Sequence, residues 1–474
     1  MKIKFLVLAT WVGIGWISGI RAEPLSAPPA CGADNVIFNG TRGVLLLDGD
    51  WQALPIAGLD FTYPPPEIGW KTEKVPQIAS PSFSGGTGPY CLNLSRYIIK
   101  DGPLMRNTNM AAWFKRDFDG PAALRDDQRA LLVFKGMSYK SRVWLNGQEI
   151  GGSLNGLVPV SYDVTSILKP GSKNELVIGL ASREALIDLK NRTFLAPAAG
   201  ANPGIWDDVE LQIVPSTRID DVFIKPSVKN KRVDIDVTVV NDGREARSVS
   251  VEGEIVDSHQ DQQTSLAPVT VTINPGESRT VTVGADWVAP HLWSPQTPVL
   301  YFARLQLREG EKTVDTHMDR FGVRDFEIRG KDFYLNGVRT VLLRTSMLDL
   351  PGSHPSAQVF FSPPGSPFNV IRLHAGFDCS ALLDHCDELG FMAMPESGWY
   401  EAMGDMFPTK QRDIWLPNVE AYLQGLMRLH RNHPSIIIWN LTNETMWGDT
   451  SPEKMEVADA LLAVAKAAEP SDVP

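Results

Sequence analysis

The chain has 474 residues, with 45 Lys and Arg against 56 Asp and Glu, so its net charge is -11. Hydrophobic residues make up 43% and charged residues 21% of it, which excludes a disordered chain, and the length suffices for about three domains. The acidic balance argues against a nucleic acid partner, because phosphate binding needs a basic face, and four cysteines are too few for a disulfide scaffold.

The first 22 residues have the features of an export signal. Lys2 and Lys4 form a basic start, and the mostly apolar stretch 5–19 is too short to span a bilayer. Ala22 offers a small residue at the cleavage point. We therefore expect a signal peptide over residues 1–22 and a periplasmic or extracellular protein without stable membrane insertion. The alternative is an uncleaved membrane anchor.

Residues 23–215 are predicted to form a first β domain. Its early part is rich in Gly and Pro, and strand-like runs become clear from residue 111 onward. The dipeptide Asn146-Gly147 is a strong signal for a hairpin turn between two strands. The strand-like runs lie at 131–134, 142–145, 163–165 and 174–178.

Residues 216–325 are predicted to form a second β domain. Apolar and polar residues alternate over 233–239, so one face of that strand is buried and the other is solvated. Further strands are expected at 249–256 and within 269–283, where Asn274-Pro275-Gly276 marks a turn. Short strands at this spacing indicate an immunoglobulin-like sandwich.

From residue 326 to 474, strands alternate with helices. Four strand–helix units make half of a (β/α)8 barrel. A first helix is expected to end at Gly390 with an apolar face of Leu382, Leu383, Cys386 and Leu389. A second should lie near 418–430, burying Val419, Tyr422, Leu423, Leu426 and Met427, and a third begins at Ser451-Pro452. The candidate strands are 340–343, 369–372, 391–394 and 436–439.

The run 431–444 carries the clearest chemical signal. Its apolar part, 436–439, is typical of a parallel strand covered on both faces. Asn443 and Glu444 follow it, at the strand end where parallel barrels place their catalytic groups. Partial desolvation there would raise the pKa of the Glu444 carboxyl and suit it to donating a proton near neutral pH. The alternative is a solvated glutamate in a surface loop.

This run resembles the acid/base segment of glycoside hydrolase family 2, which includes β-galactosidases, β-glucuronidases and β-mannosidases. The resemblance rests on the Arg-Asn-His-Pro-Ser lead-in at 431–435 and the Asn-Glu pair, and it extends more loosely over residues 110–474. It implies that Glu444 is the general acid/base and that Asn443 contacts the sugar 2-hydroxyl. It also implies a sugar-binding jelly roll over 23–215, an immunoglobulin-like sandwich and the N-terminal half of a TIM barrel.

The same resemblance points to further site residues. His374 stands where family members carry a substrate-contacting His, and Arg372 is expected to brace neighbouring carboxylates. Glu396 ends the third strand, where β-galactosidases place a magnesium ligand, but Gly398 replaces their second ligand. We therefore expect no metal and no other cofactor, with a magnesium ion as in β-galactosidases as the alternative. Trp447 is a candidate for stacking on a sugar ring, or for packing.

The sequence thus predicts an exported, exo-acting, retaining β-glycosidase with a carbohydrate substrate. Retention needs two carboxylates about 5–5.5 Å apart, and no residue after Glu444 fits the family's nucleophile, so we expect a fragment. One alternative is a non-catalytic carbohydrate-binding protein with a degenerate half barrel, favoured by Arg344-Thr345-Ser346 in place of the family's Gly-x-Asn-x-His. Another is an endo-acting hydrolase of the same barrel clan, which the two leading β domains disfavour.

Overall fold

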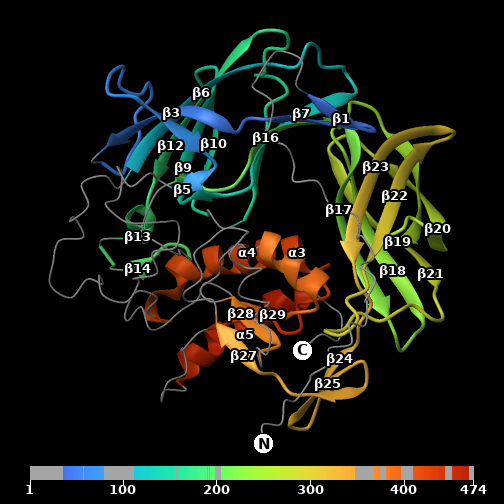
Figure 1. Ribbon diagram of the computed structural model, residues 1–474. Coiled ribbons are helices and arrows are strands. Elements are labelled where there is room, and N and C mark those ends of the chain that lie inside the picture. Colours follow the sequence, from blue (N-terminus) through green and yellow to red (C-terminus); the bar gives the residue numbers. More distant parts are fainter. Residues whose placement is uncertain are drawn as a thin grey trace, which may run out of the picture.

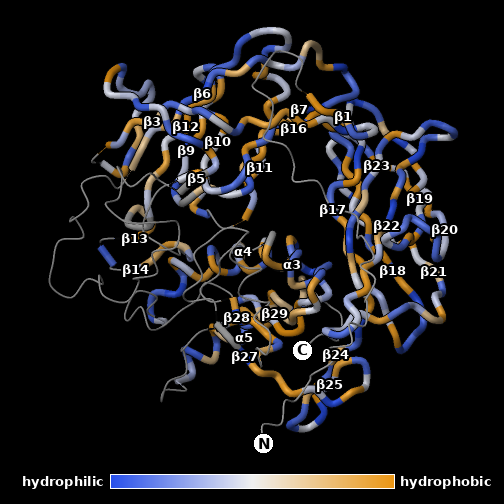
Figure 2. The backbone as a smooth tube through the Cα atoms, viewed as in Figure 1, coloured by the Kyte–Doolittle hydropathy of each residue, from blue (hydrophilic) through white to orange (hydrophobic). Residues whose placement is uncertain are grey.

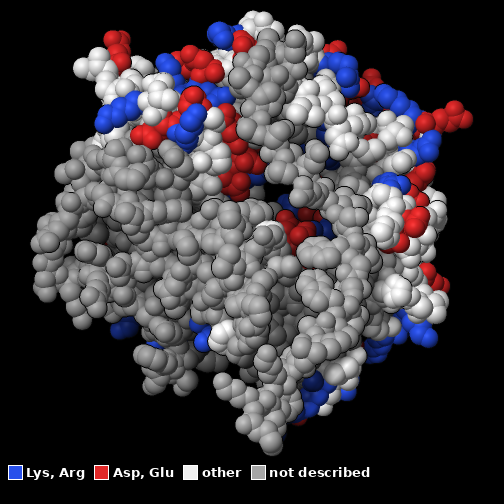
Figure 3. Space-filling model, viewed as in Figure 1, with Lys and Arg blue, Asp and Glu red and all other residues white. Residues whose placement is uncertain are grey.

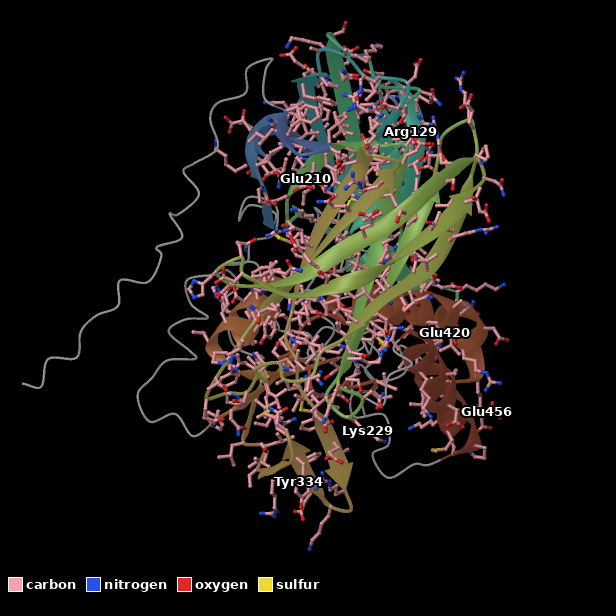
Figure 4. All side chains as sticks on the ribbon, turned by 90° about the vertical axis from the view of Figure 1, so that its right-hand side faces the viewer. Arg129, Glu210, Lys229, Tyr334, Glu420 and Glu456 are labelled. Carbon is pink, nitrogen blue, oxygen red and sulfur yellow. The ribbon has the colours of Figure 1, made fainter. Side chains whose placement is uncertain are left out.

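The computed structural model describes residues 36–56, 58–78, 111–155, 158–188, 190–191, 193–197, 204–346, 368–373, 380–396, 409–442 and 451–468. Two β units are followed by a unit in which strands alternate with helices (Figure 1). In Figure 4, the strands of the second β unit run between the first unit above and the α/β unit below, where Tyr334 marks a hairpin at the lower end. Hydrophobic and hydrophilic residues alternate along many strands of both β units (Figure 2).

The first unit is a sandwich of two antiparallel sheets, with orders β1-β2-β16-β7-β11 and β10-β9-β12-β6-β3-β4. Inward side chains of both sheets share one core that includes Trp51, Phe114 and Phe134. The hairpin predicted at Asn146-Gly147 is confirmed, since both residues adopt positive φ between β9 and β10. Its strands are β1 Ile37–Asn39, β2 Arg42–Leu46, β3 Gly49–Ile56, β4 Lys71–Val75, β6 Ala111–Asp119, β7 Gln128–Phe134, β9 Lys140–Leu145, β10 Gln148–Ser153, β11 Val160–Asp163, β12 Lys173–Ala181 and β16 Val209–Pro215.

Short elements extend this unit toward the helices. One small sheet joins β5, β15 and β8, and a second joins β13 and β14. Leu186, Ile187 and Phe194 from this extension are buried against the helices α4 (Arg412–His430) and α5 (Pro452–Ala468). The bounds are β5 Gln77–Ile78, β8 Met137–Ser138, η2 Arg183–Leu186, β13 Ile187–Asp188, β14 Thr193–Phe194 and β15 Gly204–Ile205.

The second unit is also a β-sandwich, with strand order β17-β18-β21-β20-β19-β22-β23. The single pair Ala267–Gly284 joins its two layers. Every second residue from Val233 to Val239 is buried, as the alternation predicts, and these side chains pack on those of the opposite layer. Its strands are β17 Thr217–Ser227, β18 Arg232–Asn241, β19 Arg247–Asp257, β20 Gln262–Ile273, β21 Glu277–Asp286, β22 Tyr301–Glu309 and β23 Lys312–Phe321.

The third unit begins with an antiparallel meander, β24 Phe326–Arg329, β25 Asp332–Leu335 and β26 Val338–Thr340. A parallel sheet follows, with β27 Arg344–Ser346, β28 Val370–Leu373 and β29 Met392–Pro395. The predicted strand at 340–343 is therefore wrong: Thr340 ends the meander, and the parallel strand starts at Arg344. The apolar run that suggested it is not buried, since Val341 is 58% and Leu343 44% exposed.

The parallel sheet is covered on both faces, as a buried parallel strand requires. On one face α3 (Ser380–Leu389) buries Leu382, Leu383 and Cys386 against the sheet. Its predicted end at Gly390, with φ +72°, is confirmed, but Leu389 lies at the helix end and is 45% exposed rather than inward. On the other face Val370, Met392 and Ile437 pack against Trp293, Phe326 and Leu335.

Two longer helices complete the described part of this unit. The helix α4 (Arg412–His430), preceded by η5 (Thr409–Gln411), starts earlier than predicted but buries all five predicted residues. The helix α5 (Pro452–Ala468) begins as predicted, with the Ser451 carbonyl accepting from the Lys454 and Met455 N–H groups. Among the described helices, none is long and apolar enough to cross a membrane.

Candidate active site

The ends of three parallel strands meet at one edge of the barrel sheet. Register places Ser346 of β27 beside Arg372 of β28, and Arg372 beside Met394 of β29. The segment 436–440 continues this sheet, with parallel bridges from Ala393 to Ile436 and from Glu396 to Asn440. The predicted fourth strand thus runs alongside the third, and its carboxyl end points to the edge where barrel enzymes carry their active sites.

The segment 436–440 is not a regular strand, however. Between its two bridges it takes four residue steps, from Ile436 to Asn440, while β29 takes three, from Ala393 to Glu396. One extra residue against a regular neighbour is a β-bulge, which redirects the following side chains. The bulge turns Asn440 to the face that carries Glu396, whereas Ile436 packs on the opposite face with α3.

Arg372, Glu396 and Asn440 form the described core of the candidate site. Arg372 Nη2 lies 2.5 Å from Glu396 Oε2, and Asn440 Nδ2 donates to the same oxygen at 3.1 Å. The Glu396 side chain is fully buried and that of Arg372 is 15% exposed. The Asn440 N–H also donates to the Pro395 carbonyl at 2.8 Å. A buried carboxylate is thus stabilised by a guanidinium and an amide, which fixes both neighbouring strand ends.

Two of the predicted site residues therefore lie together. Arg372 braces Glu396, the kind of contact expected of it. The other four predicted residues, His374, Asn443, Glu444 and Trp447, lie outside the described residues. Sequence reasoning missed Asn440 as a site residue. The signal in the sequence was a polar residue directly after the apolar run 436–439. Members of the family usually have Gly or Ser between that run and the Asn-Glu pair.

The geometry bears on metal binding at Glu396. A magnesium ion would need a free carboxylate oxygen and further oxygen ligands, but Arg372 and Asn440 both occupy Oε2. A positive guanidinium 2.5 Å away also repels a cation. The guanidinium and the amide on Oε2 therefore disfavour a cation at that oxygen of Glu396.

A second charged cluster lies at the other end of the segment. Asp384, Asp387 and His433 are close enough to share an ion, but Arg320 lies 2.5 Å from Asp384 and 3.5 Å from Asp387. His433 Nδ1 is 2.7 Å from Asp387 Oδ2. Burial alone would lower the pKa of His433, but this hydrogen bond and the charges of Asp387 and Asp384 raise it overall. The cluster is therefore an ion-pair network.

Comparisons with known proteins identify the family to which this chain belongs. The model described as the glycosyl hydrolase 2 galactose-binding domain-like matches residues 102–199, and the model described as glycosyl hydrolases family 2 matches residues 217–324. The model of the TIM barrel domain of glycosyl hydrolases family 2 matches residues 372–472. Together they cover well over half of the chain, in the family's order. The chain belongs to glycoside hydrolase family 2. The family assignment predicted from the run 431–444 is confirmed.

The curated relatives of this family 2 chain are distant and longer. A putative β-glucuronidase of Formosa agariphila is 26% identical over 71% of this chain and 40% of its own length. A β-galactosidase of Priestia megaterium is 25% identical over 68% of this chain and 33% of its own length. The chain thus spans well under half the length of either relative.

Solved structures share the fold. A putative β-galactosidase from Bacteroides fragilis superposes with a TM-score of 0.72 at 20% identity, over 91% of this chain and 63% of that one. A Bacteroides uniformis β-glucuronidase, bound covalently to an aziridine, gives 0.70 at 22% identity, over 90% and 51%. The predicted architecture of a sugar-binding-like β domain, sandwich sheets and a TIM-barrel domain is therefore confirmed at this level.

Proposed function

We propose that this chain is part of an exported, exo-acting, retaining β-glycosidase in which Glu444 is the general acid/base and Asn443 contacts the sugar 2-hydroxyl. The observation that supports this most is the meeting of Arg372, Glu396 and Asn440 at the carboxyl end of the barrel strands. Glu444 follows Asn440 by four residues. Membership of family 2, with relatives named β-glucuronidase and β-galactosidase, supports a β-glycoside as the substrate.

The described residues would serve this chemistry by holding the site in shape. Glu396 is buried and paired with Arg372, so it is better suited to bracing the strand ends than to reacting with substrate. Arg372 supplies the positive charge that pairs with the buried carboxylate of Glu396. We propose that no metal takes part, because the Glu396 oxygen that faces Arg372 already accepts from a guanidinium and an amide.

A retaining mechanism requires a second carboxylate about 5–5.5 Å from the first. In the family that nucleophile lies on a later barrel strand, and the relatives extend far beyond the part that this chain matches. We therefore propose that the 474 residues hold the first half of the barrel and the acid/base, and that the nucleophile lies outside them. Alone, they should not turn over glycosides.

The test compares the complete gene product with its Glu444→Gln variant on matched substrates. A panel of p-nitrophenyl β-glucuronides, β-galactosides and β-mannosides first identifies the sugar, and NMR of the released anomer tests retention. Glu444→Gln should then slow a methyl glycoside by about 10²–10⁴-fold, because that leaving group needs a proton. A 2,4-dinitrophenyl glycoside, which departs unprotonated, should be affected much less in its glycosylation step. Equal loss on both would remove Glu444 from the acid role.

Two further outcomes bear on the remaining parts of the proposal. A complete gene product that binds sugars but hydrolyses none would favour a carbohydrate-binding protein. Turnover by the 474-residue chain itself would place the nucleophile within it. Export is tested by intact-mass measurement of the protein from culture supernatant or periplasm. Loss of residues 1–22 would support a signal peptide, and their retention would favour an anchor.

A further inference from the structure

Several residues of the lead-in 431–436 are bound to the second β unit. Arg431 Nη2 is 2.5 Å from Asp221 Oδ2, and its guanidinium lies over the Phe223 ring at 4.3 Å. Arg324, just after β23, donates through Nε to the Pro434 carbonyl at 2.6 Å and through Nη2 to the Ile436 carbonyl. Two sequence runs that lie over a hundred residues apart are thus joined directly at the base of the acid/base segment.

Asn432 makes the most specific of these contacts. Its Oδ1 accepts from the Ile224 N–H at 3.0 Å, and its Nδ2 donates to the Val222 carbonyl at 3.0 Å and to Asp319 Oδ2 at 2.7 Å. Strand β17 is at the edge of its sheet, so its outward N–H and carbonyl groups need partners. The Asn432 amide pairs with them as another strand's peptide group would.

This contact fixes the position of the segment along its own axis. A primary amide that pairs with both an N–H and a carbonyl of one strand resists a shift by one residue, because that shift presents groups that face the other way. Gly322 adds a second constraint, since a Cβ there would lie 2.8 Å from Pro434 side-chain atoms. Beyond it, Ile436 and Ile437 are buried and leave no room to slide.

We infer that Asn432 is a positioning residue for the acid/base: the edge of β17 sets the register of segment 432–440, and through it the placement of Asn443 and Glu444. The segment is held at its base by Asn432 and Arg324, and at its tip by the bond from Asn440 to Glu396. The segment is short and tied at both ends, so we expect the loss of the contacts at its base to shift its tip. The second β unit therefore helps to set the geometry of the site. This inference rests on the proposed function.

The experiment uses the complete gene product and two substrates that share a sugar, a methyl and a 2,4-dinitrophenyl β-glycoside. A general acid displaced by about 1 Å loses up to about 10²-fold in rate. Asn432→Ala should therefore lower kcat/KM, which reports the glycosylation step, by about 10²-fold on the methyl glycoside and by no more than about 3-fold on the dinitrophenyl glycoside. Asn432→Asp should lower the rate on the methyl glycoside at least as strongly, because it places an oxygen against the Val222 carbonyl and Asp319 Oδ2.

A matched control separates positioning from loss of stability. Asp315, on the same strand as Asp319, is buried and pairs with Arg42 of the first β unit, with Arg42 Nη2 2.6 Å from Asp315 Oδ2. Asp315→Asn should lower the melting temperature but leave the ratio of the two kcat/KM values unchanged. Should Asn432→Ala not fold, Asn432→Ser, which keeps one hydroxyl for the β17 edge, takes its place in the same comparison.

The outcomes distinguish this inference from the proposed function. If Glu444→Gln discriminates between the two substrates but the Asn432 variants alter both equally or neither, Asn432 has only a structural role and the inference is overturned. The same holds if Asp315→Asn changes the ratio as strongly as Asn432→Ala. If Glu444→Gln does not discriminate, the acid assignment fails, and the inference fails with it.

Discussion

Arg372 and Glu396 form a buried ion pair across two adjacent parallel strands, with Nη2 and Oε2 2.5 Å apart. Register sets Arg372 directly beside Met394, so Glu396 is the next residue along β29 on the same face. Below this pair the same face is apolar, with Val370 and Met392 in a shared cluster. The inner face of the sheet therefore changes from hydrophobic to charged at the edge where the candidate site lies.

The first prediction concerns this pair. Removing one partner leaves an uncompensated buried charge, so Arg372→Met and Glu396→Gln should each lower the free energy of unfolding by about 3–5 kcal/mol. The double variant should lose clearly less than the sum, because neither charge then remains alone. Denaturant titration of the four proteins measures this coupling. The exposed pair of Arg339 and Asp332, 2.7 Å apart, serves as a control and should show little coupling. Additive losses at Arg372 and Glu396 would contradict the ion pair.

The second prediction concerns metal ions. Arg372 and Asn440 both contact Oε2 of Glu396. Added Mg²⁺ should therefore not raise the melting temperature, and EDTA should not lower it. A specific site would instead produce a shift that grows with ion concentration, by mass action. Ca²⁺ in parallel separates magnesium binding from general effects of divalent ions. A saturating, magnesium-specific rise would show that the ion displaces the guanidinium.

Local patterns in the sequence predicted several elements correctly. The five residues predicted to be buried in α4 recur at helical spacing, and the Asn146-Gly147 turn follows from the tolerance of both residues for positive φ. Both signals lie within one element, so no distant partner is needed to interpret them. The family assignment also came from one contiguous run, 431–444, because its residues satisfy constraints that few other sequences share.

What the sequence did not predict depends on partners far along the chain. The start of β27 is set by Arg344 pairing with Val370, not by the apolar residues before it. The bulge that redirects Asn440 arises from the mismatch with β29. Asn432 lies in the recognised run, but its three hydrogen bonds reach residues between 113 and 210 positions away. No local periodicity encodes such contacts.

The third prediction concerns the close contact at Gly322. A Cβ there would lie 2.8 Å from Pro434 Cβ and Cγ and 3.1 Å from Trp293 Cβ, all within a packed interface. Gly322→Ala should therefore lower the free energy of unfolding by about 1–3 kcal/mol, as overpacking does. The matched change Gly58→Ala, where no atom lies within 4 Å, should leave it nearly unchanged. Equal stability of the two variants would mean that the segment at Pro434 can move away freely.

The fourth prediction concerns the pH dependence of stability and Asp48 of the first β unit. Burial and the neighbouring Asp208 raise the pKa of Asp48 to about 7 from its ordinary value of 3.8, although the Val209 N–H opposes this shift. The folded state therefore binds more protons than the unfolded state between these two values. Stability should fall as the pH rises through this window, and the loss should be complete above about pH 7.

Asp48→Asn should remove that loss. An asparagine Oδ1 can still accept from the Val209 N–H, now 3.0 Å from the carboxylate, and its amide can donate to Asp208. The variant should therefore match the parent near pH 4 and exceed its melting temperature by a margin that grows up to about pH 7 and then stays constant. Thermal unfolding at pH 4, 5, 6, 7 and 8 measures the margin. Asp126→Asn, the same charge change at an exposed residue, is the control. A margin that does not change with pH, or one that Asp126→Asn reproduces, would show that Asp48 carries no such penalty in the folded state.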